Sequence, residues 1–96
     1  MRWAPECPVM KKEHAAKAAL LKALGHPIRF CIVEGLLSGE QNVNTMVDCT
    51  GIPQPTVSQH LNILRSAGVL KATRSGNQIR YSVCSQAARK AVQALK

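Results

Sequence analysis

The sequence predicts a small, mainly α-helical domain with one β-hairpin, in the α+β class. From about residue 11 to residue 67, apolar residues recur at spacings of three and four, which is typical of amphipathic helices. After Gly68 the spacing changes to two on both sides of Ser75-Gly76-Asn77, which is typical of a hairpin. A chain of 96 residues is long enough for one domain with a modest core.

Composition supports a globular protein built from aliphatic side chains. Apolar residues make up 46% and charged residues 19% of the chain, with only one Trp, one Tyr and one Phe. No apolar run approaches the ~20 residues that span a bilayer, and residues 1–10 lack the hydrophobic core of a secretion signal. We therefore expect a cytoplasmic protein with no membrane partner.

The chain is expected to begin with an irregular arm at residues 1–10, and residues 11–96 are expected to form a single domain. The first part of this domain holds two predicted helices. A helix is predicted over residues 11–24, which are rich in Ala, Leu and Lys and are followed by Gly25. Pro27 is suited to open the second helix, with His26 as its start residue. Phe30, Val33 and Leu37 share its apolar stripe, which Ile32 and Leu36 widen, and Ser38-Gly39 closes the helix.

Two further helices are predicted around a glycine turn. The third helix covers residues 43–49 and is short, and Thr50-Gly51 supplies the turn that follows it. The fourth helix covers residues 54–67. Pro55 lies in its first turn, where a proline is tolerated. Val57, Leu61 and Leu64 form its buried stripe. This pair of helices predicts a helix-turn-helix, with the fourth helix as its recognition helix.

The face of the fourth helix opposite its apolar stripe is polar and free of carboxylates. Such side chains offer donors and acceptors to base edges and do not repel phosphates. We expect this face to contact DNA through Thr56, Ser58, Gln59, His60 and Asn62.

The hairpin completes a winged helix-turn-helix, in the order four helices, two strands and one helix. The strands are expected at residues 69–74 and 78–83, with Arg74 and Arg80 flanking the tip, where they can meet phosphate or the minor groove. Ser85 is suited to cap a last helix. Ala88, Val92 and Leu95 are expected to point inward from that helix.

Charge is unevenly distributed along the chain, whose net charge is +8. All five carboxylates lie at or before Asp48, and seven Lys and Arg residues follow it. This asymmetry favours a polyanionic partner such as double-stranded DNA. A solvated basic surface is the alternative, and an anionic membrane is disfavoured because the cations do not share one helix face.

Three segments together resemble the ArsR/SmtB family of bacterial winged-helix repressors. They are Ala-Leu-Gly-His-Pro-Ile-Arg at 23–29, Gln-Pro-Thr-Val-Ser-Gln-His-Leu-Asn-Ile-Leu-Arg-Ser-Ala-Gly-Val-Leu at 54–70, and Ile-Arg-Tyr-Ser-Val at 79–83. The resemblance covers about residues 15–84. It implies a homodimer joined through the first and last helices, and an operator-binding repressor released by an inducer. The matching positions also imply that Gln54 faces DNA together with Thr56, Ser58, Gln59 and His60, while Arg74 and Arg80 act from the wing. Two-fold symmetry then implies a pseudo-palindromic operator with recognition helices ~34 Å apart.

The chain departs from the metal sites of that family. Members with zinc sites on the last helix use Asp, His or Glu, and none of these follows His60 here. Members with a thiolate site carry Cys-x-Cys near the start of the third helix. The corresponding residues 43–45 hold no cysteine, and Cys49 lies at the end of that helix.

Four separated cysteines, Cys7, Cys31, Cys49 and Cys84, leave three alternatives open. Thiolates gathered across a dimer suit a soft ion such as arsenite, Cd(II) or Zn(II). A thiol pair instead suits a redox or persulfide switch, and relatives with thiols on the second and last helices loosely resemble Cys31 and Cys84. The third alternative is that the cysteines are buried packing residues.

Two other function classes compete with a repressor. A small thiol enzyme is disfavoured because three dispersed histidines and five carboxylates supply no evident base with an orienting partner. We therefore do not expect an enzyme. The other alternative is a protein-interaction module, in which the same winged helix binds a protein and not DNA. Replacing Ser58 and Gln59 by alanine separates the two, because only a repressor needs these side chains for DNA readout.

Overall fold

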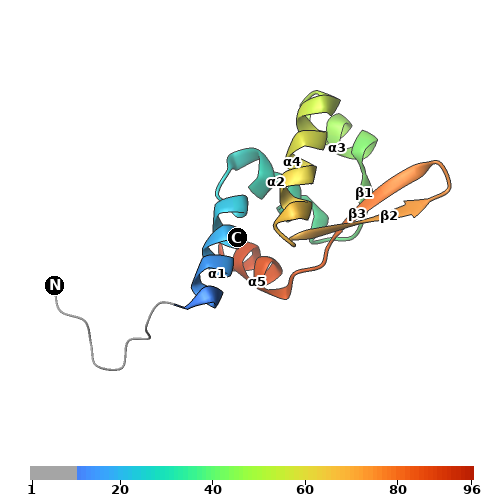
Figure 1. Ribbon diagram of the computed structural model, residues 1–96. Helices are drawn as coiled ribbons and strands as arrows, with labels where there is room; N and C mark the ends of the chain where they lie inside the picture. The colour runs from blue at the N-terminus through green and yellow to red at the C-terminus, as the bar shows by residue number, and fades with distance from the viewer. Residues whose placement is uncertain (1–10) are drawn as a thin grey trace, which may run out of the picture.

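The structure, a computed structural model, describes residues 11–96, and the predicted arm with Cys7 lies outside this range. The helices are α1 (Lys12–Leu24), α2 (Pro27–Leu36), α3 (Val43–Thr50), α4 (Gln54–Ser66) and α5 (Gln86–Ala94). The strands are β1 (Gln41–Asn42), β2 (Leu70–Ser75) and β3 (Gln78–Val83). Figure 1 shows the winged arrangement, which confirms the predicted fold class. No helix within residues 11–96 is long and apolar enough to cross a bilayer.

One hydrophobic cluster joins all the helices to the hairpin. The stripe of α4 is its centre, because Val57, Leu61 and Leu64 are fully buried as predicted. The other buried members come from α1, α2, α3, β2, β3, α5 and the residue before β2: Ala23, Leu24, Ile32, Val33, Leu36, Met46, Val69, Leu70, Tyr81, Ala88 and Val92. A helix that contributes a full stripe to such a cluster has its rotation about its own axis fixed by burial.

One predicted inward position needs correction. Leu95 follows the end of α5 and its side chain is 74% exposed, although its spacing from Ala88 and Val92 predicted an inward position.

The broad apolar face expected for α2 is present. Ile32, Val33 and Leu36 are buried, and Phe30 and Leu37 are half-buried against the same core. This width fits the packing of α2 against α4, β3 and α5.

The sheet contains a third strand that the sequence did not reveal. Its strand order is β1-β3-β2, with Gln41 opposite Tyr81 and Asn42 opposite Arg80 in antiparallel pairing. A two-residue strand is too short to show an alternating pattern. The same Asn42 caps α3, because its Oδ1 accepts a hydrogen bond from the Thr45 amide at 2.8 Å. β1 therefore ties the wing to the helix-turn-helix.

Glycines allow the two tightest turns. Gly51 ends α3 at φ +73° and donates its amide to the Val47 carbonyl at 2.8 Å, which turns the chain towards α4. The hairpin turn is one residue shorter than predicted, because Ser75 pairs with Gln78 across it. Gly76 has φ +62°, and a positive φ at the first central residue is what a type II′ turn requires.

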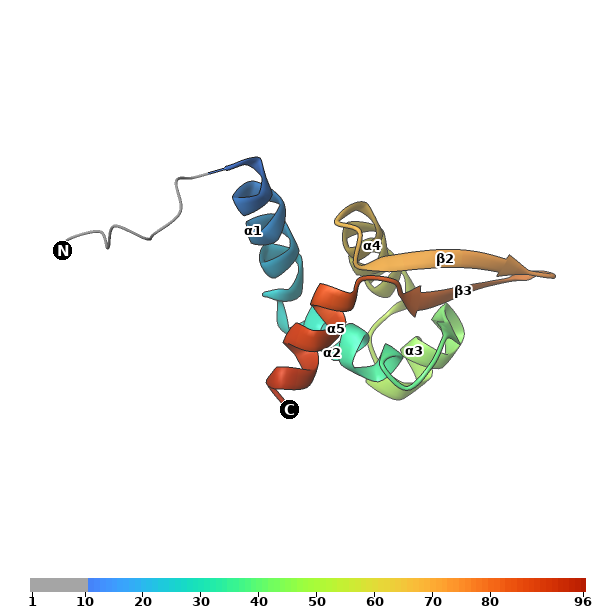
Figure 2. The ribbon, with the colours of Figure 1, turned by 90° about the horizontal axis from the view of Figure 1, so that it is seen from below.

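The wing and the α1–α5 pair lie at opposite ends of the molecule. Figures 1 and 2 show β2 and β3 extending away from the helices on the side of α3 and α4. α1 and α5 contact each other at the other end. Ser85 caps α5 as predicted, its Oγ accepting from the Ala88 amide at 3.1 Å. This arrangement keeps the outer face of α4 beside the wing.

Candidate nucleic-acid interface

The outer face of α4 is the polar surface that the sequence predicted. Gln54, Gln59 and Asn62 are exposed, and Thr56 and Ser58 are half-buried. Gln54 Nε2 donates to Ser58 Oγ at 2.9 Å, which orders two side chains one helical turn apart. Because the opposite side of the helix is held in the core, Gln59 and Asn62 face away from the monomer, and Gln54 is exposed at the first turn of the helix.

His60 lies differently from its neighbours on α4. Its ring packs against His26, with ring centroids 4.6 Å apart, and Arg29 Nη1 lies 3.4 Å from His60 Nδ1. The structure thus turns His60 towards α2, whereas the sequence predicted that it faces DNA. We do not retain it as a base-contacting residue.

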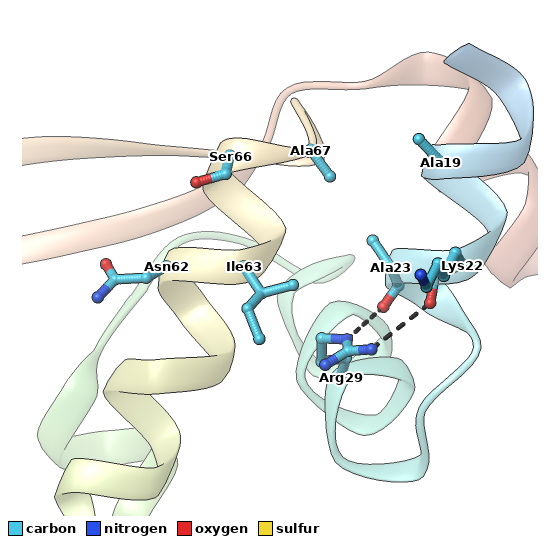
Figure 3. A pocket seen from close by; sticks show the side chains of 8 residues that line it. All are labelled: Ala19, Lys22, Ala23, Arg29, Asn62, Ile63, Ser66 and Ala67. Atoms are coloured by element: carbon cyan, nitrogen blue, oxygen red, sulfur yellow. Dashed lines mark hydrogen bonds between the residues drawn. The ribbon is translucent and has the colours of Figure 1, made fainter. Parts of the chain in front are cut away.

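Arg29 joins three helices at this point, and no sequence pattern indicated that role. Its Nε donates to the Ala23 carbonyl at 2.6 Å, and its Nη2 lies 3.5 Å from the Lys22 carbonyl, both at the end of α1 (Figure 3). Its Nη1 reaches His60 on α4. His26 starts α2 as expected, its Nδ1 accepting from the Ile28 amide at 3.1 Å. Arg29 therefore links the recognition helix to α1 and α2.

A groove of about 560 Å³ lies between α1 and the second half of α4, beside this junction. Figure 3 shows Arg29 below the groove, Ile63 directed into it from α4, and Asn62 on the far side of α4. Ala19 and Ala23 form the opposite wall, so the groove is mainly apolar. Asn62 consequently belongs to the outer polar face as well as to the groove rim.

The two arginines predicted at the wing tip project from opposite faces of the hairpin. Arg74 pairs with Ile79, and Arg80 pairs with Thr73 in the adjacent register. Successive residues of a strand point to opposite sides of the sheet. The side chains of two adjacent cross-strand pairs therefore also lie on opposite sides, with Arg74 in one pair and Arg80 in the other. Arg74 is exposed and Arg80 is half-buried. A duplex that contacts the wing edge can therefore meet a cation on either side.

One of the cations counted in the second half has a structural partner. Arg89 on α5 donates from Nη1 to the Leu37 carbonyl at 3.2 Å, which satisfies a backbone group after the end of α2. Charge counting alone could not separate this arginine from those at the wing.

The described cysteines are not packing residues. Cys31, Cys49 and Cys84 are all exposed, so the alternative of buried thiols is wrong for them. Cys31 on α2 and Cys49 on α3 line one pocket of about 240 Å³, whereas Cys84 is not part of that pocket. Cys84 Sγ lies 3.5 Å from the Gly68 carbonyl and 3.6 Å from the Val69 carbonyl. No group of three or more Cys, His, Asp or Glu is placed to hold a metal ion within residues 11–96.

Together, the helix pair around Gly51, the polar outer face of α4 and the sheet-anchored hairpin define a winged helix-turn-helix protein. The chain belongs to the arsR family of bacterial regulatory proteins, whose family model matches residues 26–72. It is 46% identical over 66 residues to the HTH-type transcriptional repressor SmtB of Mycobacterium tuberculosis. That match covers 69% of this chain and 49% of the relative, so the chain spans about half the length of that repressor.

Other relatives match over more of their length. The biofilm growth-associated repressor of Xylella fastidiosa is 40% identical over 86 residues, which cover 90% of this chain and 75% of the relative. The structure of HlyU from Vibrio cholerae superposes with a TM-score of 0.85 at 28% identity, covering 90% of this chain and 94% of HlyU. The structure of BigR from Xylella fastidiosa superposes with a TM-score of 0.77 at 38% identity, covering 90% of this chain and 93% of BigR. The family resemblance is confirmed, and the family is one of regulators and not of enzymes.

The His60 junction predicts a pH-dependent stability. Partial burial lowers the pKa of His60 below its ordinary value of 6.5, and the neighbouring His26 and Arg29 lower the same pKa further. The unfolded chain then binds more protons than the folded one between the lowered pKa and 6.5. The free energy of unfolding should therefore fall as the pH is lowered through this window, measured by urea unfolding at a series of pH values.

His60→Gln should flatten this pH dependence, because the proton-binding group is gone. His14→Gln is the matched control, since His14 lies on α1 and its ring nitrogen accepts only from the Lys11 amide. An unchanged slope in His60→Gln would show that another group is responsible.

Proposed function

We propose that the protein is a transcriptional repressor that binds a pseudo-palindromic DNA operator as a homodimer and is released when an inducer acts on its cysteine thiols. The observation that carries the proposal is the polar, carboxylate-free face of α4, held outward beside a basic wing. Membership of the arsR family and relatives named as repressors support it.

The dimensions of α4 suit the major groove. Its 13 residues give a rod ~20 Å long, and a major groove ~12 Å wide admits one helix. Gln54, Ser58 and Gln59 then lie where amide and hydroxyl groups can bond to base edges or phosphates. Thr56 and Asn62 extend this face, and Arg74 and Arg80 contribute phosphate contacts from the wing.

Removing polar groups of α4 should weaken sequence-specific binding. We expect Ser58→Ala and Gln59→Ala to reduce affinity for a duplex from the protein's own promoter region. Where the lost group contacts a base edge, the reduction should be roughly 5- to 150-fold. Arg74→Gln should weaken binding to all duplexes and reduce the salt slope by about one. Fluorescence anisotropy at several salt concentrations measures both effects.

Gln93→Ala, at an exposed position of α5, is the matched control and should leave affinity unchanged. Operator binding that survives both α4 substitutions, or that does not depend on salt, would contradict DNA readout by this helix. In that case the interaction-module alternative would gain support.

The α1–α5 end supplies the apolar surface that the proposed homodimer needs. Leu21 is 60% and Leu95 is 74% exposed, which is high for large apolar side chains. Together with Phe30 and Ala91 they line a groove of about 130 Å³. A two-fold axis at this end would place the same patch of a second copy against it. The outward position of Leu95, unexplained in the monomer, fits such an interface.

A charge at this surface should dissociate the dimer. We expect Leu95→Asp to shift the protein from dimer to monomer in sedimentation velocity, because an unpaired carboxylate would be buried at the interface. Ile79→Asp is the control, since Ile79 is an equally apolar residue, 41% exposed, on the wing. Dissociation by both variants, or by neither, would argue against this interface.

Thiol control rests on the exposure of Cys31, Cys49 and Cys84. Exposed thiols react with polysulfides and oxidants, and thiolates from two protomers can share a soft ion such as arsenite. Either reaction must favour a conformation that binds DNA poorly in order to act as an inducer. The competing proposal is a family regulator whose cysteines do not sense anything.

Treatment with polysulfide, arsenite or Cd(II) should release the wild-type protein from its operator, with thiol loss measured by intact mass. A variant with all four cysteines changed to Ser should bind the operator but not respond. If the wild type keeps its affinity under every treatment, or if the cysteine-free variant responds equally, the competing proposal holds.

A further inference from the structure

We propose that the pocket between α2 and α3 takes a small, neutral, largely apolar electrophile of the enone class, which adds to the thiol of Cys31 or Cys49. This inference deepens the thiol control proposed above and rests on it for the regulatory consequence. It assigns a ligand chemistry to one pair of thiols and leaves Cys84 outside the site.

The two thiols line the pocket from different helices. Cys31 and Gly35 lie one helical turn apart on α2, and Thr45 and Cys49 lie one turn apart on α3. A ligand held in this pocket therefore has a thiol on each of the two helices within the same lining.

The rest of the pocket is suited to an uncharged molecule. Its walls include Ile32, Leu36 and Met46, and no charged side chain lines it. Both lining hydroxyls already have acceptors: Thr45 Oγ1 donates to Asn42 Oδ1 at 3.0 Å, and Thr50 Oγ1 donates to the Met46 carbonyl at 2.7 Å. A charged ligand would lose hydration here without gaining a partner of opposite charge.

Size and ligand count favour an organic molecule over an ion. A volume of about 240 Å³ lies below the usual ~300–1,000 Å³ of sites for drug-sized ligands, so a single small ring is a fitting occupant. Two thiols and the Met46 thioether are the soft ligands in the pocket, and neither a carboxylate nor an imidazole lines it. Structural thiolate sites for Zn²⁺ supply four ligands, so this pocket alone leaves such an ion incompletely coordinated.

The chemical step is a conjugate addition. The thiolate sulfur bonds to the β-carbon of the enone, and the π electrons of the C=C bond move to give an enolate. The α-carbon of the enolate then takes up the proton that the thiol released. The product is a thioether with the same atoms as thiol plus enone, and no oxidant or reductant is consumed.

An adduct in this pocket would act on the recognition helix through α3. α3 packs against α4 and follows directly from β1, whereas α2 carries Ile32, Val33 and Leu36 in the core. A ring held between α2 and α3 would therefore displace the less anchored α3, and α4 with it. The adduct would thus favour a conformation that binds the operator less tightly.

The test compares 2-cyclohexenone with iodoacetamide on the reduced full-length protein, with the rate at each cysteine resolved by peptide mass spectrometry. Cys84 is an internal control, because it is exposed but outside the pocket. For each cysteine, the rate with 2-cyclohexenone is divided by the rate with iodoacetamide. This ratio should be at least about tenfold higher at Cys31 or Cys49 than at Cys84, because burial of roughly 55 Å² of the apolar surface of the enone in the pocket corresponds to a factor of ten in binding. Equal ratios at all three cysteines would overturn the proposal.

Gly35→Leu tests the pocket without changing a thiol. A Cβ at Gly35 would meet no atom within 4 Å, and leucine is a better helix former than glycine, so the variant should fold. The added side chain should fill the pocket and bring the rate ratio down to that of Cys84. Ala87→Leu, at an exposed position of α5, should leave the ratio unchanged. A ratio that Gly35→Leu does not alter would overturn the pocket as the cause.

Operator affinity is measured separately on the enone-treated protein. Loss of affinity that Gly35→Leu prevents would support the regulatory consequence, and full labelling with unchanged affinity would overturn it. A protein that does not bind its operator at all would refute the repressor proposal, while the labelling ratios would still decide the ligand site.

Discussion

Burial of one stripe of α4 is the constraint on which the candidate interface depends. Val57, Leu61 and Leu64 have no exposed surface, and they contact a core formed by every other helix and both long strands. Their burial fixes how α4 is rotated about its axis. The outward direction of Gln59 and Asn62 follows from that rotation and does not need contacts of their own with the core, whereas Gln54 is exposed because it is the first residue of the helix.

Two polar junctions then fix where α4 lies relative to its neighbours. At one end, Arg29 bonds to carbonyls that end α1 and reaches His60 on α4. At the other, Asn42 belongs to the sheet and also caps α3. Hydrophobic burial is not directional, whereas these hydrogen bonds are. The wing and the recognition helix are therefore held in one arrangement.

Two surfaces of the monomer carry apolar or reactive side chains that are not packed in the core. The α1–α5 end exposes large apolar side chains, and the α2–α3 pocket exposes two thiols among apolar walls. Both adjoin elements that support α4. A partner or ligand bound at either surface is thus positioned to change the recognition helix, which is how a small regulator can couple two sites.

The sequence by itself determined the helices, the hairpin and the apolar stripe of α4, because period, proline and glycine positions and the Ser85 cap are local signals. Only the tertiary structure decided that His60 turns inward, that Arg74 and Arg80 lie on opposite faces, and that β1 exists. It also brought Cys31 and Cys49 to one pocket. The faces of the two arginines depend on the exact length of the hairpin turn. The other features depend on contacts between residues far apart in the chain, which leave no repeating pattern in the sequence of either partner.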